Sequence, residues 1–242
     1  MNVKKKYCLT YTEFYLLAGS MGISHFYGFT DGAMEVSGEK DIIQLLFRLK
    51  NKHFLEVNET GYQVVAPIRQ MLEEIRIAPK LIKVYATDQR FPMRCIYLGQ
   101  NPVIVELGGL QGNFLKIYEE EWNTLFEDLS SDGVLLPQNV SDELLYQEQE
   151  IMLEEIENFD LRVFLQSVNL GRETLSCPKM NVIGVQTVLE LHDTLVGKIK
   201  KSLLLITCPL IDIIAVLKAD AVKIYCYSQN KLEELVREMQ EE

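Results

Sequence analysis

Apolar residues recur at helical spacing near the start of the chain, over residues 10–21. Thr10 is followed three residues later by Glu13, which is the capping-box pattern found at the start of many helices. Gly22 directly after this stretch is a natural helix end, because glycine adopts the left-handed backbone conformation without strain. The pattern predicts a helix with one apolar stripe, formed by Phe14, Leu17, Ala18 and Met21.

Two further helices and a hairpin are predicted next. A second helix over about 39–52 is indicated by apolar residues at helical spacing, namely Ile42, Leu45, Leu46 and Leu49. The sequences FLEV and YQVV flank NETG, where Gly61 suits the turn of a short β-hairpin. Pro67 opens a third helix at a first-turn position, and Pro79 closes it. The order helix, helix, hairpin, helix makes residues 10–78 a winged-helix-like segment.

The later part of the chain contains an internal repeat. Residues 80–129 align with residues 187–236 without gaps, and eleven of the 50 paired positions are identical. That is about three times the chance expectation for this composition. Both copies alternate apolar and polar residues, as half-buried strands do, and then show an amphipathic helical pattern. Each copy is therefore predicted to form four antiparallel strands and a terminal helix.

Two related sheet units favour one continuous domain over two separate ones. Packing about a pseudo-two-fold axis with a shared edge would remove strand edges that otherwise invite aggregation. No Gly/Ser/Pro-rich linker separates the units. We predict an α+β fold with duplicated antiparallel sheet units, their terminal helices and the winged-helix-like N-terminal segment. Its halves would be residues 1–135 and 136–242 of a single quasi-symmetric domain, 1–242.

The region between the two copies is rich in glutamate. Ser141 is predicted to cap a Glu-rich helix over about 142–158. Its acidic side chains are interpreted as a solvated face, and the alternative is contact with a basic partner surface. Two strand-like runs follow the helix, LRVFLQSV and KMNVIGV.

Charge is unevenly distributed along the chain. The net charge is −11, but residues 1–100 carry +3 and residues 101–242 carry −14. Because nucleic-acid binding needs a basic field, the acidic remainder argues against nucleic acid and against anionic membranes. The five cysteines include no CxxC pair, which fits a reducing compartment. No targeting or membrane-spanning segment is predicted, so we expect a cytoplasmic protein.

The sequence contains no recognisable catalytic, cofactor or metal-binding motif. Only three histidines occur, His25, His53 and His192, and none stands in an HExxH or Cys/His ligand pattern. The glycines of GGLQGN lie between two predicted strands, which favours a hairpin turn over a phosphate-binding loop. His192 occupies the place of Tyr85 in the other copy, which favours a packing or surface role. We therefore predict a non-enzymatic protein without a cofactor, whose partner is another protein.

The aromatic segment HFYGFTDG is the one stretch that the predicted helices and strands leave unexplained. Aromatic side chains in an exposed loop are frequent anchors of protein interfaces. The alternative is that these rings cover the neighbouring helices. The predicted partner contact consists of His25, Phe26, Tyr27 and Phe29.

Three stretches of the chain carry a resemblance to a known family. They are LTYTEFYLLAGSMGI, then LLFRLKNKHFLEVNETGYQVVAPIRQML with the strand-like LIKVYA, and CIYLGQNPVIVEL leading through LKIY into a helix. In these stretches the chain resembles the EspG family, cytosolic chaperone-like proteins of ESX (type VII) secretion. The resemblance implies a quasi-two-fold α+β fold and a non-enzymatic protein that shields an apolar surface of a secreted helical partner. It transfers no site residue, and the second half, with its strand-like LRVFLQSV, agrees only in the order of its elements.

Two other functions stay open on the sequence alone. A DNA-binding regulator would use residues 10–78 as a winged helix and contact phosphates through the basic end of the second helix. That end carries Arg48, Lys50, Lys52 and His53. The opposing interpretation is a solvated helix end, where cations suit the helix dipole. An enzyme with an unfamiliar active site would need a deep pocket with convergent polar groups. A homodimer is compatible with either binding function.

Overall fold

The computed structural model describes residues 5–23, 26–28, 38–59, 61–108, 114–136, 149–152, 184–207, 212–218 and 221–241. The strands in chain order are β1 (Tyr7–Thr10), β2 (Leu55–Asn58), β3 (Gly61–Val64), β4 (Lys80–Ala86), β5 (Arg94–Tyr97), β6 (Val103–Leu107), β7 (Phe114–Glu119), β8 (Gln149–Met152), β9 (Gly184–Asp193), β10 (Lys198–Thr207), β11 (Ile213–Leu217) and β12 (Ala221–Cys226). The helices are α1 (Tyr11–Ser20), α2 (Glu39–Asn51), α3 (Ala66–Ile77), α4 (Trp122–Ser131) and α6 (Gln229–Glu241).

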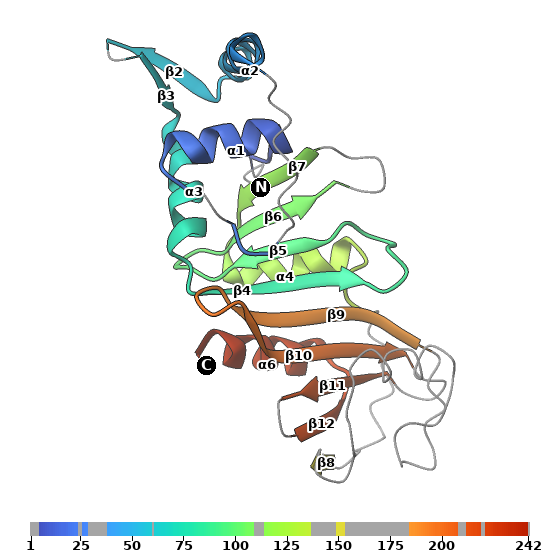
Figure 1. The fold of residues 1–242 in the computed structure, drawn as a ribbon. Helices are drawn as coiled ribbons and strands as arrows, with labels where there is room; N and C mark the ends of the chain where they lie inside the picture. The colour runs from blue at the N-terminus through green and yellow to red at the C-terminus, as the bar shows by residue number, and fades with distance from the viewer. Residues whose placement is uncertain are drawn as a thin grey trace.

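Within these residues, one large antiparallel sheet runs through the molecule (Figure 1). Its order is β1-β7-β6-β5-β4-β9-β10-β11-β12-β8, and β4 and β9 pair at the centre. On one side of this pair follow β5, β6 and β7, and on the other side follow β10, β11 and β12. An edge strand from earlier in the chain, β1 or β8, completes each side. The predicted α+β class with a large antiparallel sheet is confirmed.

Corresponding strands on the two sides do not align residue for residue. After β7 the Glu120 amide donates to the Pro102 carbonyl, and after β12 the Tyr227 amide donates to the Asp212 carbonyl. The two donors lie 107 positions apart, as the ungapped alignment of the repeat requires, but the two acceptors lie 110 apart. The ungapped alignment is therefore displaced by three residues at the start of β6 and β11. The duplication itself stays a prediction.

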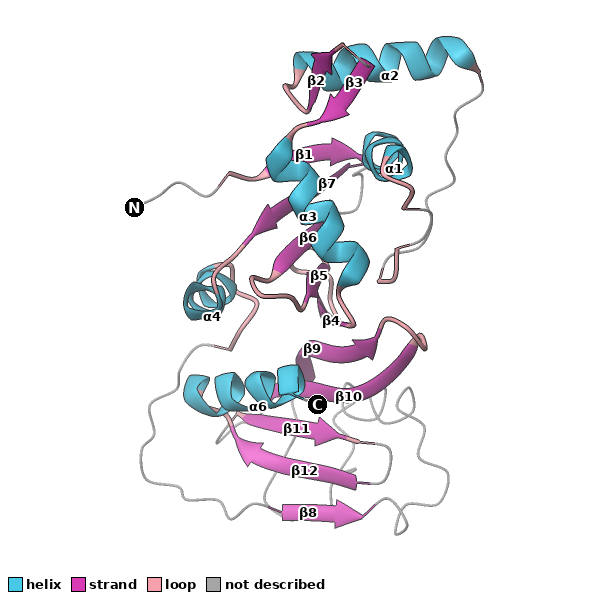
Figure 2. Cartoon of the chain, turned by 90° about the vertical axis from the view of Figure 1, so that its left-hand side faces the viewer, coloured by secondary structure: helices cyan, strands magenta, loops and turns pink. Residues whose placement is uncertain are grey.

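Helices cover both faces of the sheet. α4 and α6 lie on one face and share a core with strands from both sides of the central pair (Figure 2). α1 and α3 lie on the opposite face and pack against β5, β6 and β7. Because successive residues of a strand point to opposite faces, β4 contributes Leu81 to one core and Ile82 to the other. On the face that α4 and α6 cover, the buried residues of these helices are Leu125, Phe126 and Leu129 in α4 and Leu232, Leu235, Val236 and Met239 in α6.

The N-terminal segment has the predicted order of helix, helix, hairpin and helix. α1 begins with the predicted capping box, in which the Glu13 amide donates to Thr10 Oγ1 at 3.1 Å and the Thr10 amide donates to Glu13 Oε2 at 2.8 Å. Glu13 is buried, and Lys52 Nζ after α2 lies 2.7 Å from its Oε2. This ion pair joins the first helix to the end of the second. Gly61 adopts a φ of 125° as the first residue of β3.

Two sequence-based predictions are wrong in detail. β8 is a strand paired with β12, so the helix predicted over about 142–158 is incorrect at these four residues. A strand at this position satisfies backbone groups of β12, which a helix cannot do, and this outweighs the helix propensity of the Glu-rich sequence. Ile42, predicted in the buried stripe of the second helix, is 39% exposed. The rest of that predicted helix and most of the two strand-like runs lie outside the described residues.

Candidate functional site

The structure describes two of the four aromatic-loop residues predicted as a partner contact, Phe26 and Tyr27. Phe26 is buried, and its ring centroid lies 4.6 Å from that of Phe14 and 5.9 Å from that of Tyr15. Phe26 therefore packs on α1, as the alternative interpretation of this loop requires. His25 and Phe29 lie outside the described residues, so the role of the loop as a contact stays a prediction.

Tyr27, the other described residue of the predicted contact, belongs to a hydrogen-bonded network at the centre of the sheet. Its Oη lies 3.0 Å from His192 Nδ1, and His192 Nε2 lies 3.0 Å from Glu190 Oε2. Tyr85 Oη donates to Glu190 Oε1 at 2.9 Å. The pairing of β4 with β9 places Lys83 opposite Glu190 and brings the side chains of Tyr85, Glu190 and His192 to one face.

Burial and hydrogen bonding act against each other on the Glu190 carboxyl. Burial raises its pKa, but hydrogen bonds from His192 and Tyr85 and the nearby charge of Lys83 lower it, and the net pKa lies below its ordinary value. Burial, followed by the negative charge of Glu190, raises the pKa of both Tyr27 and Tyr85. The network therefore keeps Glu190 ionised beside neutral tyrosine hydroxyls.

This network is satisfied within the chain. Both carboxylate oxygens of Glu190 and both ring nitrogens of His192 have partners at hydrogen-bond distance. Complete buried networks of this kind rigidify a fold and specify its packing. His192 is 4% exposed, which agrees with the packing role that the sequence favoured. The described ranges hold no group of three or more His, Cys, Asp or Glu placed to bind a metal ion.

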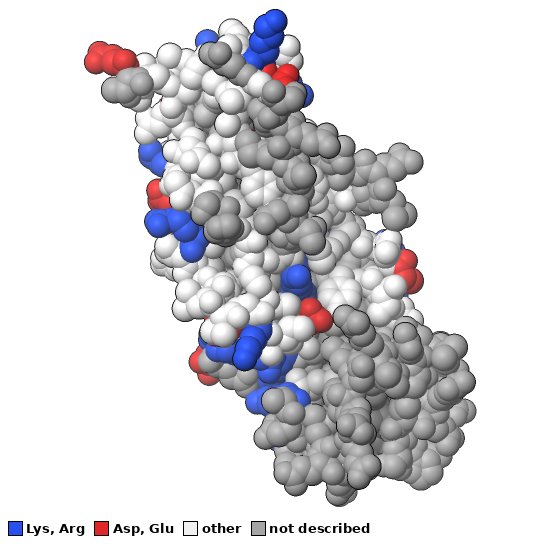
Figure 3. All heavy atoms as spheres, viewed as in Figure 1, with Lys and Arg blue, Asp and Glu red and all other residues white. Residues whose placement is uncertain are grey.

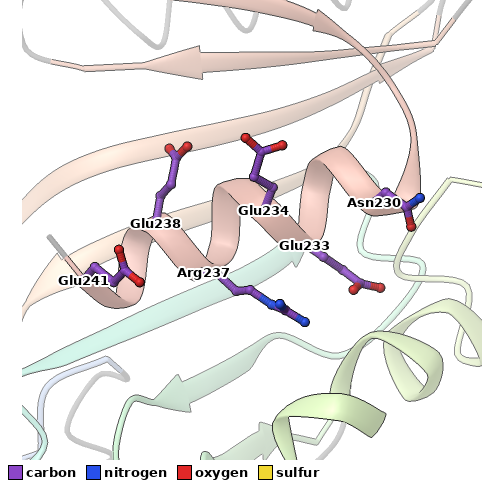
Figure 4. Close-up of a pocket in the computed structure, with 6 residues that line it drawn as sticks. All are labelled: Asn230, Glu233, Glu234, Arg237, Glu238 and Glu241. Carbon is purple, nitrogen blue, oxygen red and sulfur yellow. The ribbon is translucent and has the colours of Figure 1, made fainter.

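An open cavity of about 330 Å³ lies along the outer face of α6 (Figure 4). Its lining side chains all come from this one helix, and in Figure 4 they project outward rather than converge on one point. Glu238 lies 3.2 Å from the buried Lys201 Nζ and so is part of an ion pair. This arrangement is typical of a solvated acidic helix face rather than of an active site. The lining residues are Asn230, Glu233, Glu234, Arg237, Glu238 and Glu241.

Apolar side chains lie exposed on α2, at the end of the molecule where this helix and the β2–β3 hairpin project beyond the large sheet (Figure 1). One face of α2 packs inward through Leu45 and Leu49, which are 3% and 0% exposed. Ile42 continues this stripe towards the start of the helix, and Ile43 and Phe47 form a second stripe beside it. The exposed fractions of Ile42, Ile43 and Phe47 are 39%, 46% and 56%.

The neighbouring β2–β3 hairpin also carries exposed apolar side chains. Leu55 and Val64 pair across the hairpin and are buried. The next pair on the same face, Val57 and Tyr62, is 59% and 46% exposed. The apolar face of the hairpin thus continues past the edge of the core. We define the α2–hairpin patch as the side chains of Ile42, Ile43, Phe47, Val57 and Tyr62.

Cationic residues occur in the same elements as the α2–hairpin patch. Arg48 and Lys50 are exposed on α2, and His53 is exposed just after it, with a φ of 58°. Lys52 instead binds the buried carboxylate of Glu13. The four residues predicted to touch phosphates are therefore three solvent-facing side chains and one member of a structural ion pair.

Comparison with known proteins identifies a similar fold. No family model matches the chain, and no curated protein matches it. Among solved structures, the chain is similar to EspG5, a type VII secretion system chaperone of Mycobacterium tuberculosis, in its complex with the PE25–PPE41 dimer. The TM-score is 0.57 at 10% identity, and the match covers 95% of this chain and 93% of that chain. This chain has an EspG-like fold. At this identity the likeness concerns the fold alone, and at that level the resemblance predicted from the sequence is confirmed.

Sequence reasoning missed the α2–hairpin patch, although a signal was present. Ile43 and Phe47 lie four positions apart and outside the stripe assigned to the core. Periodicity identifies which residues share a face, but it does not say how far the core extends along that face.

The described part of the chain has no helix that is long and apolar enough to cross a membrane.

Proposed function

We propose that this chain is a non-enzymatic, chaperone-like protein of the cytoplasm that binds another protein and shields an apolar surface of a secreted helical partner. The α2–hairpin patch carries this proposal. Apolar side chains that a folded protein holds in solvent, with polar residues around them, commonly mark protein-contact surfaces. The similarity in fold to a secretion chaperone bound to a PE25–PPE41 dimer supports the same class of function.

The patch can supply part of the free energy that specific binding needs. Its five side chains are between 39% and 59% exposed. Burial of the exposed part of each contributes on the order of 1 kcal/mol. Part of this gain is offset by the lost freedom of the two proteins, so polar contacts must add to it. An amphipathic helix suits such a surface, because its apolar stripe can cover the patch while its polar face stays in water.

The proposal is tested by comparing the proteins that co-purify with the wild-type chain and with two variants from the native cells. F47S/Y62S removes both aromatic rings of the patch, and Phe114→Ser changes a side chain of β7 that is 39% exposed outside it. We expect one partner to be retained by wild type and F114S and lost with F47S/Y62S, because aromatic residues often dominate interface energetics. The affinity of the purified partner for each of the three chains is then measured by calorimetry.

Two outcomes would overturn this proposal. One is that no protein co-purifies reproducibly with the wild-type chain. The other is that F47S/Y62S recovers the same partner as wild type with unchanged affinity. Light scattering of the purified chain adds a separate check, since a homodimer that F47S/Y62S dissociates would mean that a second copy covers the patch.

A winged-helix DNA-binding function is the second candidate, because Arg48, Lys50 and His53 face solvent. The net charge of −11 and the exposed apolar side chains of Ile43 and Phe47 on the same helix favour a protein contact. A gel shift at low salt with mixed-sequence duplex DNA decides between them. Retardation that R48E/K50E abolishes would favour DNA binding, and unretarded DNA would exclude it.

The absence of enzymatic activity is part of the proposal. The similar solved structure is a chaperone rather than an enzyme. The buried titratable groups of the central network, Glu190 and His192, are bonded to one another and to tyrosines. Their hydrogen bonding is accounted for without a substrate.

A further inference from the structure

The turn between β9 and β10 presents large apolar side chains to solvent, where turns ordinarily carry small or polar residues. Leu195 and Val196 at its tip are 87% and 63% exposed, and Ile199 at the start of β10 is 50% exposed. Ile77, the last residue of α3, is 61% exposed. We define the β9–β10 turn patch as the side chains of Ile77, Leu195, Val196 and Ile199.

Hydrogen bonds hold the tip of this turn in one conformation. The Asp193 carboxylate accepts from the amide of Leu195 at 3.0 Å and from the amide of Val196 at 3.1 Å. Gly197 adopts a φ of 68°, which glycine tolerates without strain, and donates its amide to the Asp193 carbonyl at 2.9 Å. The two apolar side chains are therefore fixed in an outward position.

Thr194 attaches the turn to the end of α3. Its amide donates to the Pro79 carbonyl at 3.0 Å, and its hydroxyl donates to the Ala78 carbonyl at 2.7 Å. These bonds attach the turn to the residues that directly follow Ile77, the last residue of α3. An apolar surface that is already ordered loses little conformational entropy when it binds.

Cationic residues flank the apolar residues of the β9–β10 turn patch along the chain. Arg76 and Lys198 are exposed, and Lys200 is 40% exposed while its Nζ lies 3.0 Å from Asp193 Oδ2. Figure 3 shows blue Lys and Arg surface at the level of this turn, with smaller red areas of Asp and Glu beside it. The carboxylate of Asp193 is engaged inside the turn, whereas Arg76 and Lys198 are exposed next to Ile77 and Ile199 in the sequence. This combination complements a surface that carries apolar and anionic side chains.

We propose that the β9–β10 turn patch binds an acidic, amphipathic segment of a partner protein. Apolar side chains of that segment would cover Leu195 and Val196, and its carboxylates would pair with Arg76 and Lys198. The two patches lie towards opposite ends of α3, which begins after the hairpin and ends at Ile77 (Figure 1). The β9–β10 turn patch is therefore a contact distinct from the one assigned to the α2–hairpin patch.

An anionic bilayer also combines apolar and negatively charged groups, but its flat surface suits the β9–β10 turn patch less well than a protein segment does. The end of α6 reaches this part of the molecule, since Lys80 Nζ donates to the Gln240 carbonyl at 3.0 Å. A flat anionic surface placed over the turn would also come close to the exposed Glu241, whose carboxylate repels it. The net charge of −11 adds to this repulsion. A narrow protein segment meets the cations around the tip without that repulsion.

The test uses the full chain and three fluorescent peptides of about 20 residues, a length that supports a helix. All three have the same Leu stripe, and their polar positions are Glu, Gln or Lys. We expect the Glu peptide to bind at least about tenfold more tightly than the Lys peptide in anisotropy titrations, with affinity falling as salt rises. L195S/V196S should weaken Glu-peptide binding about tenfold, whereas Phe47→Ser in the other patch should leave it unchanged.

A charge-reversal variant sharpens the test. R76E/K198E should shift the preference from the Glu peptide towards the Lys peptide, because neither side chain takes part in the bonds that hold the turn. Circular dichroism of each variant checks that it folds as wild type does.

Four results would overturn the proposal. They are equal binding of the three peptides, Glu-peptide binding that survives L195S/V196S, turn-dependent binding to phosphatidylserine vesicles in place of the Glu peptide, and a wild-type dimer that L195S/V196S dissociates in sedimentation velocity. The vesicle result would assign the turn to a membrane, and the dimer result would assign it to a second copy of the chain. A fifth such result, loss of binding with F47S alone, would place the peptide on the α2–hairpin patch.

Discussion

Two regions of the molecule, the centre of the large sheet and the α2–hairpin end, depart from the usual rule that polar side chains are exposed and apolar ones buried. At the centre, Glu190 and His192 are 8% and 4% exposed. At the α2–hairpin end, Phe47 and Val57 are 56% and 59% exposed. The buried polar groups have their hydrogen-bond partners inside the chain, whereas the exposed apolar groups have no equivalent cover among the described residues.

This difference separates what stabilises the molecule from what it offers to others. A buried polar network that is complete needs nothing from outside, and removal of one member leaves the others unsatisfied. An exposed apolar side chain contributes little to stability, but it gains free energy when a partner excludes water from it. We therefore expect substitutions at the centre to change stability and substitutions at the patch to change binding.

Replacement of Glu190 by Leu is expected to have the largest effect. It leaves His192 and Tyr85 without the carboxylate that both contact, and we expect the free energy of unfolding to fall by about 3 kcal/mol. Urea denaturation measures this. Tyr85→Phe is the matched control, since it removes a single hydrogen bond and should cost about 1 kcal/mol. Wild-type stability in the Glu190→Leu variant would show that the network does not hold the centre together.

Replacement of Glu13 by Ala tests the attachment between the core and the α2–hairpin end. It removes half of the capping box of α1 and the anion that Lys52 binds, so we expect a loss of about 2 kcal/mol in the free energy of unfolding. Thr10→Ala removes only the cap and should cost about 1 kcal/mol. If the two variants were equally stable in denaturation, the ion pair with Lys52 would make no net contribution.

The central network also predicts a dependence of stability on pH. The folded state lowers the pKa of Glu190 from its ordinary value of 4.5, so the unfolded state takes up the proton first as the pH falls. The stabilisation by Glu190 is therefore present above pH 4.5 and is lost as the pH falls below it, through the folded-state pKa. The stability difference between wild type and Glu190→Gln should narrow at acid pH in denaturation series. A difference that stays constant, or widens, would contradict the assigned direction.

The smallest effect on stability is expected at the α2–hairpin patch. F47S/Y62S should change the free energy of unfolding by no more than about 0.5 kcal/mol, because both side chains already face water. The same variant should lose its protein partner. A stability loss of more than about 1 kcal/mol would mean that these rings belong to the core, and the contrast between the two regions would fail.

Much of the fold could be predicted because its signals are local. The capping box of Thr10 and Glu13 forms as expected, and the apolar stripes of α4 and α6 are buried. These features depend on residues within about one or two helical turns of each other. The prediction failed at β8, where a Glu-rich sequence becomes a strand because β12 needs a partner along its edge.

The candidate surfaces were harder to predict for a different reason. The network joins Tyr27 to His192, 165 positions later in the chain, and Tyr85 to Glu190, 105 positions later. The apolar residues of the α2–hairpin patch have the same spacing as core residues, so their pattern does not distinguish burial from exposure. Only the position at which the sheet ends decides between the two.

By itself, the sequence determined where helices begin, which of their faces are apolar and in what order the strands of each unit follow. Caps and helical hydrogen bonds join residues three or four positions apart, so a short stretch contains what they need. The tertiary structure alone decided that β4 pairs with β9, that corresponding strands of the two sides are displaced by three residues from the ungapped alignment, and that Phe47 and Leu195 face water. Strand pairing joins residues that are far apart in the chain, and its register depends on the packing of the whole sheet rather than on any one segment.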